Sequence, residues 1–295
     1  MFSKPVATAT AGTHFRDASF LEVVSQQRMK KPVIMIMTKS LHILCFGDSL
    51  THGYSKMGAL YHPYSIALQA SLEKAFPTMN ITIDEQGQNG DQVTSPPGGF
   101  LPRMDILYEE VHPTDPYTHA IILGGTNDLT QKRLPSDIYK SLQLVWDIPL
   151  GYNTTVLSLT VPEIALDPPI VPNGRLDKLN SKILNHKGGD NFHTLDLHSK
   201  VPYWDLPEAR RKEIWDDGVH FTAKGYDLIG NILADKIINL VTGVVTVPEN
   251  NVWVHGSEKE ELKRDNVMKM REVGFGAIRK RLRSGRGVEI VEAEG

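Results

Sequence analysis

The stretch that decides the fold reads LHILCFGDSLTHG and runs from Leu41 to Gly53. Its first six residues are apolar apart from His42, and such a run is typical of a strand buried on both faces of a parallel sheet. The run ends abruptly in Gly47, Asp48 and Ser49, three residues that favour turns. A lone Gly-Asp-Ser is most often only a turn, but the end of a buried strand is also where a nucleophilic serine would stand. The rest of the chain decides between these two interpretations.

Further apolar, β-rich runs alternate with helical patterns along the chain. We expect strands at 41–46, 80–85, 119–124, 155–159 and 192–197, and helices at 63–76, 101–111, 136–147, 175–186 and 222–242. The last helix has the clearest pattern, because Tyr226, Ile229, Leu233, Ile237 and Leu240 repeat at intervals of three and four residues. Thr222 is suited to cap its amino end. Alternating strands and helices predict an α/β fold with a parallel sheet, whose ligands bind at the carboxyl ends of the strands.

Composition restricts the class of protein. The formal net charge of −3 gives no overall reason to expect nucleic acid as a partner. Cys45 is the only cysteine, which excludes an intramolecular disulfide and zinc sites built on several thiolates. We find no apolar run long enough for a membrane span and no secretory signal, and therefore expect a cytoplasmic protein.

Three regions follow from the distribution of residue types. We expect an N-terminal extension at 1–40, partly disordered, a core domain at 41–245, and a charged C-terminal extension at 246–295. The C-terminal extension carries a basic cluster around Arg281, which is most simply a solvated charged tail.

Residues with catalytic chemistry follow the predicted strands or precede the last helix. Ser49 is a weak nucleophile alone, but His220 could accept its proton, and Asp217 could orient the imidazole. Attack on a carbonyl builds negative charge on oxygen, which preorganised N–H donors stabilise. The backbone N–H groups of Ser49 and Gly90 and the side-chain amide of Asn127 are candidates for these donors. The pattern therefore favours a serine hydrolase.

Four blocks of the sequence resemble the SGNH, or GDSL-type, hydrolase family. They are Gly47-Asp48-Ser49-Leu50, Gly90, Gly125-Thr126-Asn127-Asp128 and Asp217-Gly218-Val219-His220, in the order that the family shows. The resemblance implies a three-layer α/β/α fold with a mostly parallel, flavodoxin-like five-stranded sheet. It also implies Ser49 as nucleophile, His220 as base, Asp217 as its orienting acid, and Ser49, Gly90 and Asn127 as the oxyanion hole. Residues 1–40 and 246–295 are not covered by it.

Two proline-rich segments, 95–102 and 162–172, are too irregular for sheet or helix and would lie at the catalytic edge. We expect them to shape a partly hydrophobic acyl or alcohol site, although surface loops without substrate contact are about equally consistent with the pattern. The substrate-contacting side chains expected from them are Phe100, Leu101, Ile164, Leu166 and Ile170.

The sequence thus predicts a serine esterase that acts on small or medium carboxylic esters through an acyl-enzyme intermediate, without cofactor or metal. A metallohydrolase is disfavoured, because no spacing such as H-E-x-x-H occurs. An α/β-hydrolase is disfavoured, because Thr51 stands where the second glycine of its G-x-S-x-G motif belongs. A non-catalytic carbohydrate- or lipid-binding domain on the same fold remains the alternative.

Overall fold

The computed structural model describes residues 40–172 and 174–243. The predicted N-terminal extension, apart from Ser40, and the predicted C-terminal extension with its basic cluster lie outside these residues. Among the described residues, those up to Ala234 belong to one compact unit, and Asp235 to Gly243, the end of one helix and the residue after it, belong to a second.

The first unit is built on a five-stranded sheet. Its strands are β1 (Ser40–Gly47), β4 (Asn80–Gly87), β5 (His119–Leu123), β6 (Thr155–Leu159) and β7 (Phe192–Leu195). They lie in the order β4-β1-β5-β6-β7, and each neighbouring pair is parallel. This is the strand order of flavodoxin-like sheets, in which the chain reverses direction beside the first strand. The predicted fold class is therefore confirmed.

The position of each strand explains its composition. β1 lies between β4 and β5, and seven of its eight residues are buried, as its mostly apolar sequence predicts. β4 is an edge strand with a single neighbour, so it tolerates the polar residues of its sequence NITIDEQG. In the register of the sheet, Gly47 is level with both Gly87 and Leu123. Three strands thus end together, and the segments that follow them start from one edge.

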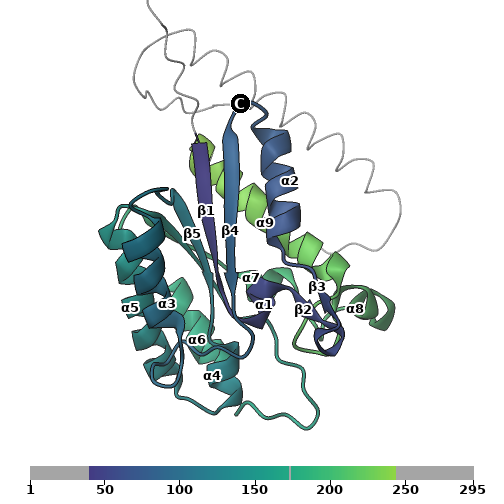
Figure 1. Cartoon of the computed structure of the whole chain (residues 1–295). Helices are drawn as coiled ribbons and strands as arrows, with labels where there is room; N and C mark the ends of the chain where they lie inside the picture. Colours follow the sequence, from purple (N-terminus) through teal and green to yellow (C-terminus); the bar gives the residue numbers. More distant parts are fainter. Residues whose placement is uncertain (1–39, 173, 244–295) are drawn as a thin grey trace, which may run out of the picture. The chain divides into compact units, whose positions relative to one another are not determined.

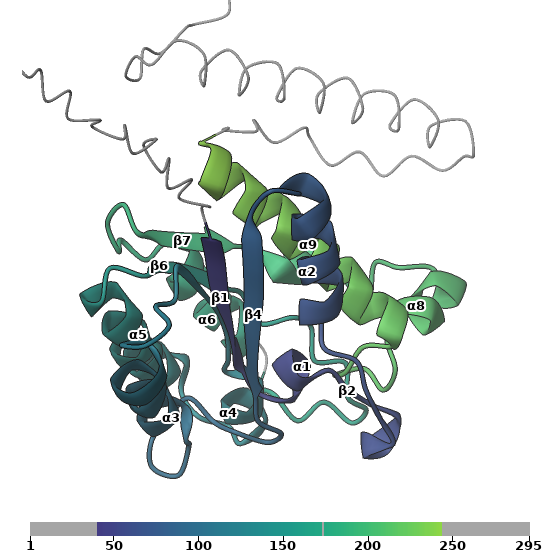
Figure 2. The same ribbon diagram turned by 45° about the horizontal axis from the view of Figure 1, so that its top comes forward.

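Helices cover both faces of the sheet (Figures 1 and 2). α2 (Ser65–Ala75) and the beginning of α9 (Ala223–Thr242) lie on one face, where the backbone of Gly230 packs closely against Tyr64 and Leu68. The other face carries α3 (Phe100–Ile106), α5 (Pro135–Gly151) and α6 (Arg175–Leu184), with the short turn η2 (Leu107–Val111) continuing α3. The predicted helices and strands match these elements to within four residues at each end.

Alternate residues of β1 face opposite sides of the sheet. Leu44 and Phe46 belong to the core that α3, α5 and α6 complete, together with the fully buried Trp146. Cys45, between them, faces the other side, where its thiol contacts the hydroxyl of Tyr64 from the segment that precedes α2. Both faces of this strand are therefore packed, which fixes its register.

Several short elements were not predicted. They are α1 (Ser49–His52), β2 (Tyr54–Ser55), η1 (Lys56–Gly58), β3 (Leu60–Tyr61), α4 (Thr126–Thr130), α7 (Leu197–Lys200) and α8 (Glu208–Ile214). β2 and β3 pair antiparallel, with η1 between them, and we call residues 54–61 the hairpin. In Figure 1, α1, α4 and the hairpin lie near the lower edge of the sheet, where the strands end.

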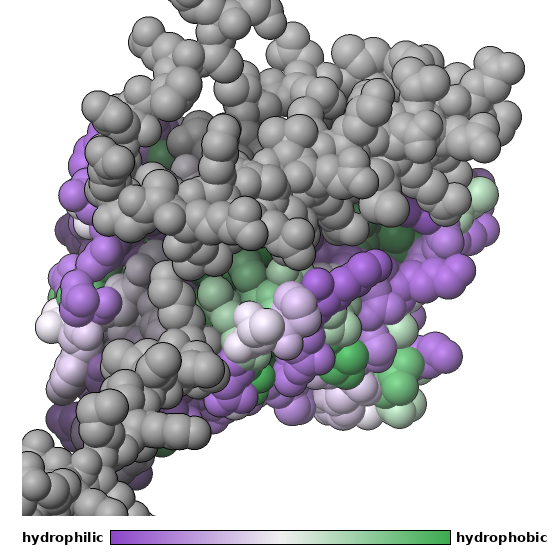
Figure 3. Space-filling view, turned by 90° about the horizontal axis from the view of Figure 1, so that it is seen from above, coloured by the Kyte–Doolittle hydropathy of each residue, from purple (hydrophilic) through white to green (hydrophobic). Residues whose placement is uncertain are grey.

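The opposite edge, where the strands begin, is seen in Figure 3. On the visible part of this surface, hydrophobic residues lie in smaller groups among the hydrophilic ones. Within the described part of the chain, the structure contains no helix that combines the length and apolar character needed to cross a bilayer.

Candidate active site

Ser49 is presented by a sharp turn at the end of β1. It is the first residue of α1, and the carboxylate of Asp48 caps this helix by accepting the N–H of Leu50 at 2.9 Å. Gly47 is required where the chain turns, because a Cβ at this position would collide with the side chain of Thr51 and the carbonyl of Leu123. The cap formed by Asp48 and the close turn at Gly47 thus fix the backbone around Ser49, and the serine lies at the edge where the strands end.

His220 and Asp217 approach Ser49 from the loop before α9. Nε2 of His220 lies 3.0 Å from Oγ of Ser49, and Nδ1 of the same ring lies 2.8 Å from Oδ2 of Asp217. The other carboxylate oxygen of Asp217 accepts the backbone N–H groups of Val219, at 3.0 Å, and of His220, at 2.7 Å. The loop therefore folds around the aspartate and points the imidazole at the serine.

Electrostatics favour one tautomer of His220. Burial alone would raise the pKa of Asp217, but hydrogen bonds from the ring and the backbone of His220 outweigh it, and the pKa falls to about 2. The carboxylate is ionised at neutral pH and can only accept, so Nδ1 of His220 carries the proton and donates it to Asp217. Nε2 is then left with a lone pair toward the hydroxyl of Ser49. This is the arrangement in which imidazole can act as a base.

Gly90 lies in a tight turn after β4. The N–H of Asp91 donates to the carbonyl of Gln88 at 3.2 Å, and Gly90 has a φ of 75°. A Cβ on Gly90 would meet nothing within 4 Å, so the glycine is required here by its backbone conformation and not by a close neighbour. Asn127, in α4, donates from Nδ2 to the carbonyl of Asp91 at 2.8 Å. The two residues predicted as oxyanion donors are thus joined through Asp91.

Two charged side chains that the sequence reasoning did not assign hold these loops together. Asp128 accepts the N–H groups of Val93 and Thr94, each at 2.9 Å, and the hydroxyl of Thr94 at 2.6 Å. Arg103, from α3, donates to Oδ2 of Asp91 at 3.0 Å. It also donates to the carbonyls at the ends of β4 and β1, Gln86 at 3.0 Å and Gly47 at 2.8 Å. The turns that follow β1 and β4 are therefore fixed to the same guanidinium.

Asp48 is a fully buried carboxyl group beside the catalytic candidates. Desolvation raises its pKa from 3.8 to about 7, although the N–H of Leu50 and the charge of His220 oppose the shift. The nearby carboxylates of Asp128 and Asp91 add to the increase. Nδ2 of Asn127 lies 3.4 Å from Oδ2 of Asp48, so this acid also borders the predicted oxyanion donor.

The expected substrate contacts are only partly compatible with the structure. Phe100 is fully buried in the core, where its ring packs edge-on against Phe46, so the prediction that it contacts substrate is corrected. Leu101 packs against the same core and is half-buried. The helical start of α3 turns these side chains inward, which the proline-rich sequence before it did not reveal.

The second proline-rich segment does lie beside the His220 loop. The N–H of Ala165 donates to the carbonyl of Gly218 at 2.8 Å. Ile164 and Leu166, its two neighbours, are half-buried, and Ile170 is 38% exposed. Ile164 and Leu166 therefore flank a residue that is tied to the loop carrying Asp217 and His220.

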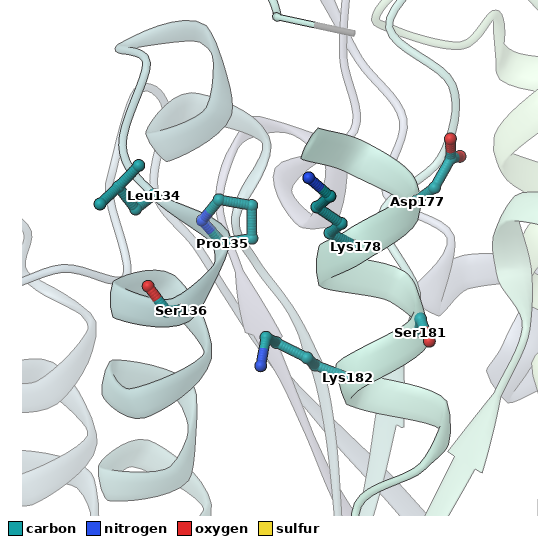
Figure 4. Close-up of a pocket in the computed structure, with 7 residues that line it drawn as sticks. All are labelled: Leu134, Pro135, Ser136, Asp177, Lys178, Ser181 and Lys182. Atoms are coloured by element: carbon teal, nitrogen blue, oxygen red, sulfur yellow. The ribbon is translucent and has the colours of Figure 1, made fainter. Parts of the chain in front are cut away.

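A separate hollow of about 630 Å³ lies between the start of α5 and α6 (Figure 4). Its lining residues are Leu134, Pro135, Ser136, Asp177, Lys178, Ser181 and Lys182. None of them belongs to the group around Ser49, and we assign the hollow no role. Within residues 40–172 and 174–243, no group of three or more His, Cys, Asp or Glu side chains is arranged to hold a metal ion.

Comparisons with known proteins identify the family of the chain. A model of the GDSL-like lipase/acylhydrolase family matches residues 45–228, more than half of the chain. The sequence comparison with curated proteins gave no significant match.

Similar solved structures include a lipase/acylhydrolase from Enterococcus faecalis, with 22% identity, a TM-score of 0.53, and coverage of 67% of this chain and 95% of that one. A carbohydrate acetylesterase from Sinorhizobium meliloti has 22% identity, a TM-score of 0.50, and coverage of 68% and 99%. The esterase EstA from Pseudoalteromonas has 19% identity, a TM-score of 0.52, and coverage of 68% and 98%. At these identities the structural likenesses establish the fold, whereas the family model establishes the membership. The chain belongs to the GDSL-like lipase/acylhydrolase family and is a carboxylic ester hydrolase.

Proposed function

We propose that this chain hydrolyses small or medium carboxylic esters by a serine mechanism, with Ser49 as nucleophile, His220 as general base and Asp217 as the acid that orients it. The observation that carries the proposal is the unbroken hydrogen-bonded series Ser49 Oγ, His220 Nε2, His220 Nδ1 and Asp217 Oδ2, with separations of 3.0 and 2.8 Å. This is the geometry that nucleophile activation by a neighbouring base requires.

The first half of the reaction transfers the acyl group to the protein. Oγ of Ser49 attacks the carbonyl carbon of the ester while Nε2 of His220 takes its proton. The imidazolium, stabilised by ionised Asp217, then gives this proton to the alcohol oxygen as the carbon–oxygen bond to the alcohol breaks. The alcohol leaves, and the acyl group remains as an ester of Ser49.

The second half releases the acid. His220 takes a proton from a water molecule, which attacks the acyl carbon, and returns the proton to Oγ of Ser49 as that bond breaks. The free acid leaves, and both side chains are restored. Neither half needs an oxidant, a reductant or a metal ion.

The developing oxyanion would be stabilised by the N–H groups of Ser49 and Gly90 and by the amide of Asn127. The turn at Gly90 and the position of Asn127 in α4 support this assignment. The side-chain amide of Asn127 donates a hydrogen bond to the carbonyl of Asp91, the residue after Gly90, and this bond joins the two at one edge of the sheet. Nδ2 of Asn127 donates to the carbonyl of Asp91 at 2.8 Å and more weakly to Oδ2 of Asp48 at 3.4 Å, and the oxyanion would replace the longer of these two hydrogen bonds.

The half-buried Ile164 and Leu166 support an apolar substrate wall beside the His220 loop. Since His220 protonates the departing alcohol, residues attached to its loop would lie on the alcohol side of the ester. We therefore assign Ile164 and Leu166 to the alcohol subsite.

The test is hydrolysis of p-nitrophenyl acetate and butyrate by wild type, Ser49→Ala, His220→Ala and the double variant. Each single change should remove most of the activity, and the double variant should be little worse than either, because residues that act as one unit are strongly non-additive. Circular dichroism would verify that the variants are folded. Near wild-type turnover by folded Ser49→Ala would refute the mechanism and favour a binding domain with incidental hydrolysis.

A further inference from the structure

A tyrosine ring lies directly against the imidazole of His220. The centroids of the Tyr54 and His220 rings are 4.6 Å apart, and the ring planes are tilted by 48°. Both nitrogens of His220 are engaged in the plane of the ring, with Ser49 and Asp217. These in-plane bonds do little to prevent the imidazole from tilting about the line that joins its partners. Tyr54 supplies a contact outside that plane.

Backbone contacts hold Tyr54 in place independently of its own side chain. The carbonyl of Tyr54 accepts the hydroxyl of Tyr226, in α9, at 2.8 Å. The N–H of Lys56, two residues on, donates to Oδ2 of Asp216 at 2.6 Å. Asp216 itself belongs to the His220 loop, because its N–H donates to the carbonyl of His220 at 2.8 Å. The hairpin is thus attached to the segment that carries the base.

A second ring supports Tyr54 from within the hairpin. The ring of Tyr61 meets that of Tyr54 edge-on at 5.9 Å, and it also packs against His52 at 4.6 Å. The hydroxyl of Tyr61 accepts the amide of Asn89, in the turn that contains Gly90, at 3.0 Å. Tyr54 is therefore enclosed by the hairpin on one side and the imidazole on the other.

From these contacts we propose that Tyr54 is a positioning residue for the general base, and this inference rests on the proposed function. Its ring limits the tilt of the His220 imidazole and so keeps Nε2 directed at Oγ of Ser49. When His220 accepts the serine proton it becomes a cation, and a cation within about 6 Å of an aromatic centroid is attracted by the ring quadrupole. The ring would therefore stabilise the imidazolium that forms when His220 accepts the serine proton, and its loss should affect kcat more than KM.

The experiment compares Tyr54→Leu, Tyr54→Phe and Tyr61→Leu in the full chain. Tyr61→Leu is the matched control, because it removes a ring from the same hairpin by the same substitution without removing the ring that touches His220. The readouts are kcat and KM on p-nitrophenyl butyrate and the rate of inactivation by phenylmethylsulfonyl fluoride, which reacts with an activated serine. Thermal unfolding verifies that each variant is folded, and Tyr54→Met replaces Tyr54→Leu if the leucine variant is not.

We expect Tyr54→Leu to lower kcat and the inactivation rate about 3- to 30-fold, the range that a lost cation–π contact produces. Its KM, and all parameters of Tyr54→Phe, should stay within about twofold of wild type. Tyr61→Leu removes only the support of Tyr54, so its loss of kcat should be clearly smaller than that of Tyr54→Leu. Full activity of Tyr54→Leu, or equal losses in Tyr54→Leu and Tyr61→Leu, would overturn the inference. If either result is found while hydrolysis still depends on Ser49, only the role of Tyr54 is refuted. If activity survives Ser49→Ala, the proposed function itself is refuted.

Discussion

Replacing Asp48 by asparagine should remove a pH dependence from the stability of this protein. The side chain is fully buried, and its pKa in the folded state is raised by desolvation. Asparagine has nearly the same shape, and its side-chain oxygen can still accept the N–H of Leu50, so the cap of α1 survives the change. The variant differs from wild type mainly in having no proton to lose.

The magnitude follows from the two pKa values. Folding raises the pKa of Asp48 from 3.8 to about 7, and each pKa unit corresponds to about 1.4 kcal/mol. The folded protein holds the proton more tightly than the unfolded chain does. The contribution of the Asp48 proton to the free energy of unfolding is therefore fully present below pH 3.8 and is lost as the pH rises through about 7. The whole loss is about 4 kcal/mol, of which about 3 kcal/mol falls between pH 5 and 8.5.

The assay is urea unfolding followed by tryptophan fluorescence, with wild type and Asp48→Asn measured from pH 5 to 8.5. The free energy of unfolding of the variant, relative to wild type, should rise by about 3 kcal/mol across this range. Asp105→Asn, at an exposed site in α3, is the control and should follow wild type throughout. A difference between Asp48→Asn and wild type that stays constant with pH would show that Asp48 is ionised at little cost, and would refute the reasoning.

Three further predictions concern the loops around Ser49. Asn127→Ala should lower kcat about 10²- to 10³-fold with little change in KM. It should also lower Tm slightly, because the carbonyl of Asp91 loses its donor. A large loss of Tm with kcat intact would show that Asn127 only stabilises the loop. Asp217→Asn should keep the hydrogen bonds from the backbone of its loop but favour the wrong tautomer of His220, which should lower kcat by about 10⁴-fold. Kinetics and circular dichroism together test this, and an unchanged kcat would exclude Asp217 as the orienting acid. Arg103→Met should lower the free energy of unfolding by about 3 kcal/mol, because Asp91, with a side chain only 4% exposed, would lose its charged partner. Urea unfolding measures this change, and a loss below about 1 kcal/mol would show that the ion pair is dispensable.

The sheet could be predicted because each strand carries its own signal. β1 is mostly apolar, since it is covered on both faces. The clear spacing of three and four residues between apolar positions located α9. The cap of α9 was predicted as well, and Thr222 accepts the N–H of Gly225 at 3.2 Å. The hairpin was missed, because β2 and β3 have two residues each and such short segments carry no periodicity.

The residues around Ser49 show a similar division. Ser49, Asp217 and His220 could be placed near one another because each follows a strand or precedes a helix with a recognisable start. The contact between Tyr54 and His220 could not be inferred, since it joins distant parts of the chain and no local pattern signals it. Phe100 was misassigned for a related reason: the sequence does not show which face of a short helix turns toward the core.

The hydrogen bond between Ser49 and His220 joins residues that are 171 positions apart. Contacts between such distant residues require closure of a long loop, and they form slowly compared with local helical contacts. The proposed nucleophile, Ser49, directly follows the first strand of the sheet, and the proposed base, His220, lies in the loop before the last helix. On the proposed mechanism, a nascent or partly refolded chain cannot hydrolyse an ester until both ends of the domain have met. In a variant whose other three tryptophans are replaced by phenylalanine, recovery of hydrolysis during refolding should therefore lag behind recovery of the fluorescence of Trp146, and the delay measures how late this domain closes.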